Sequence, residues 1–263
     1  MFVWKEMNIP DDMQLLFTTP NSTIYGNERT VIKQFSPLTM HYVKSGHIRS
    51  PKEEAEIQQY AGEHVIVPKV ISYSDDAIVM ERLPYIFAGK MFDAQLMKEL
   101  AVSLQNIHNA GYVHTDIKRR NLGLDAQGDM SILDWNGATK IGDTQTLPQY
   151  TPKYSALELK FGGEVYPQTD MYSMACIAYR AFGKTLTHTK VPNLDNYIDQ
   201  GTDNWENRRS YVDFIEQCTR TLPEERPESL DKFIEICDAI DRPFRERNVE
   251  EENNDTYVPT NYN

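Results

Sequence analysis

The sequence has few cysteines and no long apolar stretch. Its three cysteines, Cys176, Cys218 and Cys237, are far apart and odd in number, so we expect neither a disulfide framework nor a zinc site. No run approaches the roughly 18 apolar residues that a membrane-spanning helix requires. Residues 1–12 lack the basic stretch followed by an apolar run that a signal peptide would show. These absences predict a soluble cytoplasmic protein without a membrane partner.

Basic residues are also scarce. The 263 residues include 27 Lys and Arg against 39 Asp and Glu, which gives a net charge of −12. Such an excess of negative charge disfavours nucleic acids and anionic membranes as partners. The acidic balance is chiefly a property of a soluble surface, and it mildly favours basic partners. Nothing in the composition indicates an oligomeric state.

The distribution of hydrophobic residues predicts an α+β chain. With 40% hydrophobic residues, the chain is long enough for one large domain or two closely joined lobes. A helix should begin at Ser50, because Pro51 suits its first position and Glu53 completes a capping box, and it should end near Gly62. Residues 248–263 are acidic and rich in asparagine, which predicts a disordered tail. The other expected strands are 14–17, 23–25, 30–34, 70–73 and 77–82, and the other expected helices are 93–109, 169–182, 211–219 and 229–240.

Residues 112–122 carry the most informative polar pattern. Asp116, Lys118 and Asn121 lie within six residues, after an expected helix and before a short strand. Phosphoryl transfer needs a carboxylate to orient the attacking hydroxyl, a cation to neutralise phosphate charge and oxygen ligands for Mg²⁺. This segment supplies one residue of each kind. Thirteen residues after Asn121, an apolar strand delivers Asp134 into a turn, as strand ends do when they place a metal-binding carboxylate.

Both segments resemble motifs of the eukaryotic-type protein kinase family. Its catalytic loop reads His-Arg-Asp, with Lys two residues and Asn five residues after the Asp, and its metal-binding motif reads Asp-Phe-Gly. The resemblance implies a bilobal kinase fold with a small β-rich N-lobe at 1–83 and a larger helical C-lobe at 84–247. It also implies that ATP and Mg²⁺ are bound and that the γ-phosphate is transferred to Ser/Thr hydroxyls of protein substrates. By this match, Asp116 is the catalytic base, Lys118 contacts the γ-phosphate, and Asn121 and Asp134 bind Mg²⁺.

Further matches follow in the order that the family implies. Ala156-Leu157-Glu158 resembles the Ala-Pro-Glu end of an activation segment, where the Glu pairs with a buried Arg, here Arg226. Thr151 matches the Thr that contacts the catalytic Asp and Lys in Ser/Thr kinases. Asp170 matches the Asp that anchors the backbone of the catalytic loop from a buried helix.

The first third of the chain resembles the family less closely. Lys33, at the end of Val-Ile-Lys, resembles the strand lysine that holds the α- and β-phosphates. Its expected partner is Glu54, because Glu53 serves the capping box. Met80 matches the gatekeeper position before the hinge. Backbone groups of Glu81 and Leu83 would then bind adenine.

The sequence also departs from the family at several positions. No Gly-rich loop is present at residues 17–24, where hydroxyl groups of Ser and Thr are candidates to substitute in part for the glycine backbone. Trp135 replaces the usual Phe, and Asn136 replaces Gly, which we attribute to the tolerance of Asn for positive φ. Thr115 replaces the Arg that grips a phosphorylated activation loop, so we expect activity that does not depend on such phosphorylation.

Two alternatives to an active protein kinase remain open at this point. A pseudokinase that acts as a binding or allosteric module is favoured by the missing glycines and disfavoured by the retained base and metal ligands. A small-molecule phosphotransferase of the aminoglycoside-kinase type also pairs a His-x-Asp loop with Asp-Trp. Lys118 and residues 151–158 disfavour that reading, because they resemble the platform for protein substrates. The compact chain also suits a kinase of a virus, or an effector, that works inside a host cell.

Overall fold

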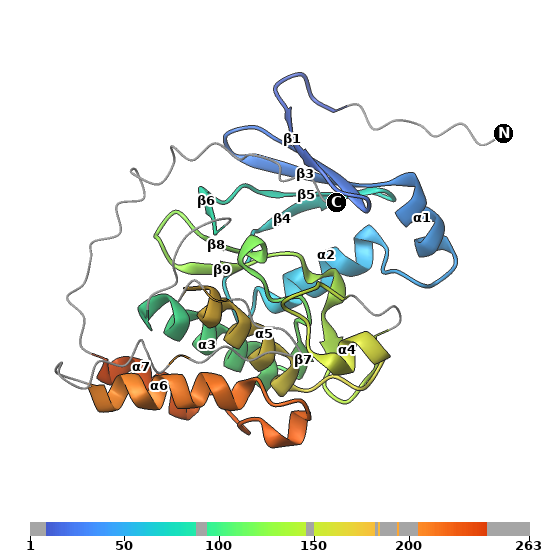
Figure 1. Cartoon of the computed structure of the whole chain (residues 1–263). Coiled ribbons are helices and arrows are strands. Elements are labelled where there is room, and N and C mark those ends of the chain that lie inside the picture. The colour runs from blue at the N-terminus through green and yellow to red at the C-terminus, as the bar shows by residue number, and fades with distance from the viewer. Residues whose placement is uncertain are drawn as a thin grey trace.

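The chain folds into an upper part built on a β-sheet and a lower part built of helices (Figure 1). This computed structural model describes residues 9–87, 94–145, 150–181, 184, 194 and 205–240. The tail predicted at 248–263 lies outside the described residues. The α+β class and the order of a β-rich part followed by a helical part are confirmed.

The upper part is a five-stranded antiparallel sheet in the order β1-β2-β3-β5-β4. In β2 buried residues alternate with partly exposed ones, as expected for a sheet with one face packed on a core. Lys33 lies in β3 between Ile24 of β2 and Ile78 of β5, so the sheet fixes its position from both sides. The strands are β1 Gln14–Thr18, β2 Ser22–Gly26, β3 Thr30–Phe35, β4 Val70–Tyr73 and β5 Ala77–Glu81, close to the predicted ranges.

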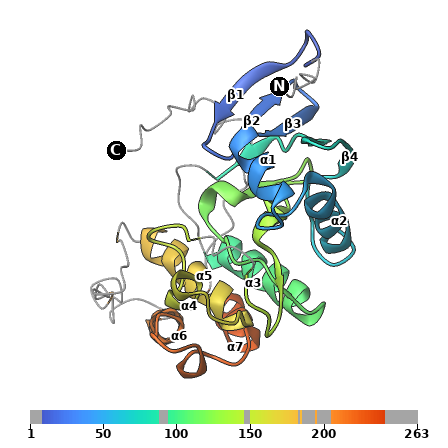
Figure 2. The same cartoon turned by 90° about the vertical axis from the view of Figure 1, so that its right-hand side faces the viewer.

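Two helices lie beside this sheet (Figure 2). Helix α2, Pro51–Ala61, has the predicted capping box between Ser50 and Glu53. Helix α1, Pro37–Lys44, was not predicted, although Ser36 caps it and proline takes its first position. The small core between helices and sheet contains Phe35, Met40, Ala55, Val70, Ile78 and Met80.

The turn between β1 and β2 occupies the place where the resemblance implies a Gly-rich loop. Thr19 Oγ1 accepts hydrogen bonds from the backbone N–H groups of Asn21 (3.2 Å) and Ser22 (3.0 Å). The Asn21 carbonyl accepts from the N–H of Ser36 (2.8 Å) and from Thr39 Oγ1 (2.9 Å). The turn is therefore tied to the beginning of α1. The hydroxyl of Thr19 serves the turn's own backbone, which does not fit the idea that it substitutes for glycine N–H groups.

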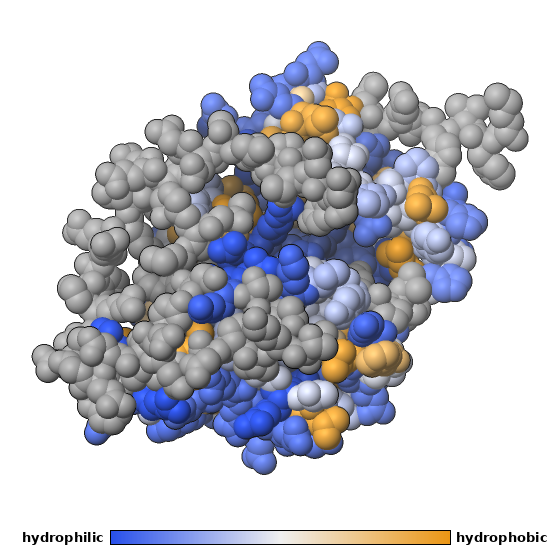
Figure 3. All heavy atoms as spheres, in the orientation of Figure 1, coloured by the Kyte–Doolittle hydropathy of each residue, from blue (hydrophilic) through white to orange (hydrophobic). Residues whose placement is uncertain are grey.

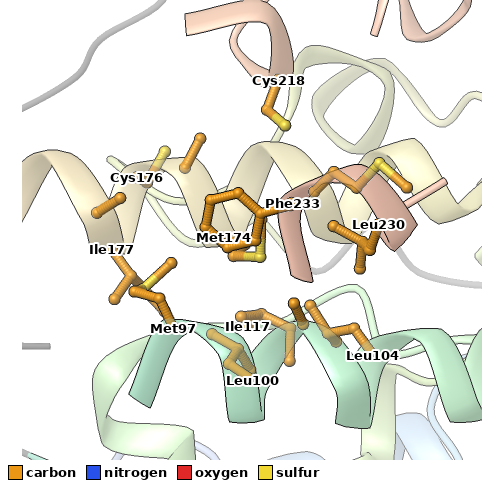
Figure 4. Close-up of a cluster of buried hydrophobic side chains, with 14 of the residues drawn as sticks. Met97, Leu100, Leu104, Ile117, Met174, Cys176, Ile177, Cys218, Leu230 and Phe233 are labelled. Atoms are coloured by element: carbon orange, nitrogen blue, oxygen red, sulfur yellow. The ribbon is translucent and has the colours of Figure 1, made fainter. Parts of the chain in front are cut away.

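In the described part of the chain, four helices of the lower part bury a large core. They are α3 Ala94–Asn109, α5 Pro167–Ala181, α6 Trp205–Cys218 and α7 Asp231–Ala239. Figure 4 shows Met97, Leu100 and Leu104 of α3 facing Met174 and Ile177 of α5, with Phe233 of α7 beside them. Helix α6 begins six residues before the predicted start, because its first turns are polar and hide the apolar period. The short helix α4, Leu157–Phe161, was not predicted.

Short strands hold the polar loops at the junction of the two parts. Strands β6 Tyr85–Ile86, β8 Leu122–Leu124 and β9 Met130–Ile132 form one small sheet, and β7 Tyr112–Val113 pairs with β10 Thr139–Lys140. Figure 3 shows hydrophilic residues gathered between the upper and lower parts on this face. Within the described ranges, no helix is both long and apolar enough to cross a membrane.

Candidate active site

The loop between β7 and β8 is anchored from below by helix α5. The Asp170 carboxylate, which is fully buried, accepts hydrogen bonds from the backbone N–H groups of His114 and Thr115, each at 2.8 Å. It also pairs with His108 Nε2 at 2.9 Å. Thr115 has a φ of 69°, a left-handed conformation that is costly for a β-branched residue. The expected anchor is present, and its hydrogen bonds offset this strain.

The Asp116 carboxylate is held by three side chains. Lys118 Nζ donates to Asp116 Oδ2 at 2.6 Å, and Asn121 Nδ2 donates to the same oxygen at 3.0 Å. Thr151 Oγ1 donates to Asp116 Oδ1 at 2.7 Å, and Lys118 Nζ lies 3.4 Å from the same hydroxyl. The structure thus shows the contacts that the resemblance implied for Thr151. Both carboxylate oxygens of Asp116 are thus held by side chains of the chain itself.

Lys33 joins three segments that are far apart in the sequence. Its Nζ lies 2.7 Å from Glu54 Oε1 of α2 and 2.7 Å from Asp134 Oδ1. The expected pairing with Glu54 rather than Glu53 is present, since Glu53 bonds to Ser50 in the capping box.

The electrostatics of this cluster keep Lys33 and Asp134 charged. Burial alone would lower the pKa of Lys33, but the carboxylates of Asp134 and Glu54 outweigh it and raise that pKa. Burial alone would raise the pKa of Asp134, but the charges of Lys33 and Lys118 outweigh it and lower that pKa to about 2. The Asp134 carboxylate is therefore ionised at neutral pH, as a metal ligand must be.

The turn after Asp134 is fixed by a buried tryptophan. Asp134 itself has a φ of 63°, so Asp134, and not Asn136, is the residue of this turn with a left-handed backbone conformation. Trp135 is fully buried, donates from Nε1 to the Ile132 carbonyl at 3.1 Å and packs edge-on against the His114 ring at 4.8 Å. The expectation that Trp135 is a packing anchor is confirmed. The expectation that Asn136 was chosen for positive φ is wrong.

Asn136 and Arg49 are site residues whose contacts the sequence did not reveal. Asn136 Nδ2 donates to Glu54 Oε2 at 2.8 Å, and Arg49 Nη1 donates to the Asn136 carbonyl. The partners are far apart in the sequence, 82 residues in the case of Asn136 and Glu54, so no local pattern could have indicated them.

The residues expected to form the hinge lie at and just after the end of β5. Met80 is buried, and the N–H of Glu81 is already bonded to the Lys69 carbonyl at 2.9 Å. Leu83 is buried beside Gly123 of β8, where an added Cβ would come within 2.7 Å of Leu83 Cδ1. The Leu83 side chain and Gly123 therefore approach each other closely next to the end of β5.

Glu158 and Arg226 form a buried ion pair below the loop. Arg226 Nη1 donates to Glu158 Oε1 at 2.7 Å, and Nη2 donates to Oε2 at 3.1 Å. Arg226 is 3% exposed and also donates to the carbonyls of Gln168 and Thr221. The pair expected from the sequence is present, and its bidentate geometry fixes the segment that follows Thr151.

Comparison with known proteins places these contacts in a family. A protein-family model described as "Protein kinase domain" matches residues 79–244, well over half of the chain. The chain belongs to the protein kinase family. The matched range contains Asp116, Lys118, Asn121 and Asp134, whereas Lys33 and Glu54 lie before it.

Several curated proteins resemble this kinase at low identity. It is 27% identical to Cyclin-dependent kinase 12 of Caenorhabditis elegans, over 64% of this chain and 26% of that protein. It is 27% identical to Serine/threonine-protein kinase F of Synechocystis sp., over 57% of this chain and 32% of that protein. Human Mitogen-activated protein kinase 13 is 30% identical over 60% of this chain and 52% of that protein. The kinase thus spans about a quarter to a third of the length of the first two relatives.

Asn121 and Asp134, the ligands expected from the sequence, carry oxygen donors of the kind that Mg²⁺ takes. The Asn121 carbonyl accepts from the N–H of Leu133 at 2.8 Å, which places Asn121 beside the residue that precedes Asp134. Among the residues that the structure describes, no three His, Cys, Asp or Glu side chains gather as a metal cage. Mg²⁺ commonly takes one or two carboxylates and completes its shell with phosphates and water. One carboxylate, that of Asp134, together with one amide, that of Asn121, suits that need better than the need of a resident structural metal.

Proposed function

We propose that this kinase transfers the γ-phosphate of MgATP to Ser/Thr hydroxyls of protein substrates. The observation that carries the proposal is the contact of Lys33 with Glu54 and Asp134, each at 2.7 Å. It brings the sheet, α2 and the candidate metal ligand together in the arrangement that phosphoryl transfer requires. The proposed setting is the cytoplasm, with proteins that carry Ser/Thr acceptors as partners.

In this proposal the cluster around Lys33 binds the nucleotide. Lys33 holds the α- and β-phosphates while Glu54 fixes the direction of its side chain. Asn121 and Asp134 hold Mg²⁺, which neutralises phosphate charge when it is bound. Backbone groups of Glu81 and Leu83 bind adenine at the end of β5.

Asp116 and its neighbours would act on the acceptor. The substrate hydroxyl oxygen attacks the γ-phosphorus, the bond to the β-phosphate oxygen breaks, and the hydroxyl proton passes to Asp116. Lys118 neutralises charge that develops on the γ-phosphate. Thr151 keeps the carboxylate of Asp116 turned toward the hydroxyl, which its 2.7 Å hydrogen bond supports.

We also propose that activity does not depend on phosphorylation of the activation segment. Thr115 stands where the family has the Arg that grips the phosphate. Its hydroxyl instead donates to the Gly137 carbonyl at 2.9 Å, within the turn after Asp134. A neutral contact inside the chain thus takes the place of a contact that needs a phosphate.

A nucleotide-binding pseudokinase is the second candidate. It is favoured by the turn between β1 and β2, where Thr19 already occupies the N–H groups of Asn21 and Ser22. These N–H groups are then not available to bind the phosphates, whereas the N–H groups of a Gly-rich loop would be. The complete set around Lys33 and Asp116 supports the active kinase more strongly.

Transfer of label from γ-labelled ATP tests the proposal. The purified chain is incubated with Mg²⁺ and with casein and histone as acceptors, beside Asp116→Asn and Lys33→Met. Lys52→Met is the matched control, because Lys52 is an exposed lysine of α2 that pairs with Glu56 at 3.7 Å. We expect label on Ser or Thr for the wild type and the control, and none for the two site variants. Nucleotide binding without transfer would support the pseudokinase, and label on the Asp116→Asn variant would contradict the assignment of the base.

A further inference from the structure

Asn136 donates a hydrogen bond to one of the two oxygens of the buried Glu54 carboxylate. Glu54 is fully buried, and its two oxygens have different partners, Lys33 on Oε1 at 2.7 Å and Asn136 Nδ2 on Oε2 at 2.8 Å. A buried carboxylate oxygen that loses its donor is costly. Asn136 stands where the family has glycine, and it completes the hydrogen bonding of Glu54. Glu54 in turn orients Lys33.

The backbone of Asn136 makes a second contact with the same helix. Its carbonyl accepts from the Arg49 guanidinium, and Arg49 directly precedes Ser50, the cap of α2. The side chain of Asn136 contacts α2 one turn later, at Glu54. Two points near the start of α2 are thus held by one residue of the turn that follows Asp134.

The next carbonyl of this turn is held by the catalytic loop and by residues that follow the turn. Gly137 O accepts from Thr115 Oγ1 at 2.9 Å, from Thr139 Oγ1 at 2.8 Å and from Gln145 Nε2 at 3.1 Å. Thr115 belongs to the catalytic loop, and it also accepts from Gln145. The turn is therefore clamped between α2 and the catalytic loop by side chains of the chain itself.

We propose that Asn136 is a positioning residue that keeps α2 docked with Glu54 against Lys33, so that the site is assembled without a phosphate. The proposal rests on the proposed kinase activity, and it names the contacts that make activation by phosphorylation unnecessary. If α2 moved away, Lys33 would lose Glu54 and the phosphate-binding amine would no longer be fixed. Hydrogen bonds to charged groups are the stronger kind, so loss of this one shifts the balance between docked and displaced α2 by about tenfold.

Steady-state kinetics of Asn136→Gly and Asn136→Asp tests the role of the side chain. Glycine restores the family's usual residue, and aspartate keeps the shape but removes the donor and adds a repelling charge. We expect both variants to show about tenfold lower kcat/KM, with a raised KM for ATP. Asn109→Gly, at the exposed last position of α3, is the control and should match the wild type. A merely structural role would reduce the active fraction and leave the KM for ATP unchanged, and that result would overturn the proposal.

Hydrogen exchange of α2 tests the clamp without relying on activity. The backbone amides of α2 after Pro51 should exchange faster in Asn136→Gly than in the wild type, while those of α3 and α7 should not change. If the wild type transfers no phosphate, the kinase proposal fails, and exchange in α2 still decides whether Asn136 holds the helix. Equal exchange in both proteins would overturn the clamp. Wild-type kinase treated with phosphatase should also keep its activity, and a loss of activity would show that a phosphate does the positioning.

Discussion

The carboxylate of Asp116 has a cation on one oxygen and a hydroxyl on the other. Lys118 lies 2.6 Å from Oδ2 and Thr151 lies 2.7 Å from Oδ1, so rotation of the carboxylate would break both contacts. Thr151 comes from the segment that the Glu158–Arg226 pair fixes. The orientation of the Asp116 carboxylate therefore depends on residues well outside its own loop.

Replacement of Thr151 by valine should lower the rate of transfer. Valine keeps the shape but removes the hydrogen bond to Asp116, and a bond to a charged group contributes about 1.5–3 kcal/mol. We expect Thr151→Val to reduce kcat at least tenfold with little change in thermal unfolding, and Thr151→Ser to retain most activity. Equal kcat for the valine and serine variants would show that the hydroxyl has no part in orienting Asp116.

At the scale of single residues, the sequence predicts groups that belong to one loop better than groups that meet across the fold. Asp116, Lys118 and Asn121 were found together because they share one loop, and Glu54 was selected because the capping box claimed Glu53. The sequence singles out Asn136 as a replacement for glycine, but it suggests only a backbone reason, the tolerance of Asn for positive φ. Its partner lies 82 residues away, and only the packing of α2 against the turn brings them together.

Among the elements, those with a clear start or a clear period were predicted best. Helix α2 was found from its capping box and α3 from its apolar period, since both signals are local. Helix α1 begins with the same Ser-Pro pair as α2, but it is only eight residues long and lacks an acidic third residue. The pairing of β8 with β6 was beyond prediction, because these strands have three and two residues.

Gly123 of strand β8 has no room for a larger side chain. A Cβ there would lie 2.5 Å from the Tyr85 carbonyl oxygen and 2.7 Å from Leu83 Cδ1, so the backbone of β6 and the Leu83 side chain would have to shift. We expect Gly123→Ala to cost about 1–3 kcal/mol of unfolding free energy and to weaken ATP binding.

Calorimetric titration with ATP and urea unfolding check this prediction. Ser131→Ala is the control, because Ser131 faces Gly123 on β9. Its buried Oγ has no hydrogen-bond partner in the described part of the chain, so its loss should be neutral or stabilising. Tight ATP binding by a stable Gly123→Ala variant would remove the hinge from the proposed adenine site.

Across the whole molecule, helix α2 is the element that joins the two parts. Ala55 belongs to the small core under the sheet, whereas Ala61 belongs to the large helical core. Glu54, next to Ala55 near the start of the same helix, meets Lys33 and Asn136. The two-part architecture was predictable from the change in periodicity along the chain, but the sharing of one helix by both cores was not. The boundaries at 83 and 247 stay predictions.

The pH dependence of stability follows from the three buried thiols. Burial raises the pKa of Cys237 to about 12 and also raises those of Cys176 and Cys218, whereas an exposed thiol has a pKa of about 8.5. Below about pH 8.5 both folded and unfolded chains keep these protons. Above it only the unfolded chain releases them, so the unfolding free energy falls as pH rises, by about 1.4 kcal/mol for each thiol at pH 9.5.

Urea unfolding at pH 7.5 and 9.5 checks this expectation. Cys237→Ala should lose less stability between the two pH values than the wild type, by about the share of one thiol. The native protein should also react slowly with a thiol reagent at pH 8.5 and quickly in urea. Rapid labelling of the folded chain would contradict the burial of these thiols.

The turn held by Thr19, Ser36 and Thr39 has a thermodynamic consequence for nucleotide binding. A flexible glycine loop must give up conformational entropy when it closes over phosphates, about 1–2 kcal/mol for each residue that becomes ordered. Here the Asn21 carbonyl and the N–H groups around it are already fixed by hydrogen bonds. Little entropy remains to be lost at this turn, so binding should have a small entropic penalty there and should proceed without a slow closing step.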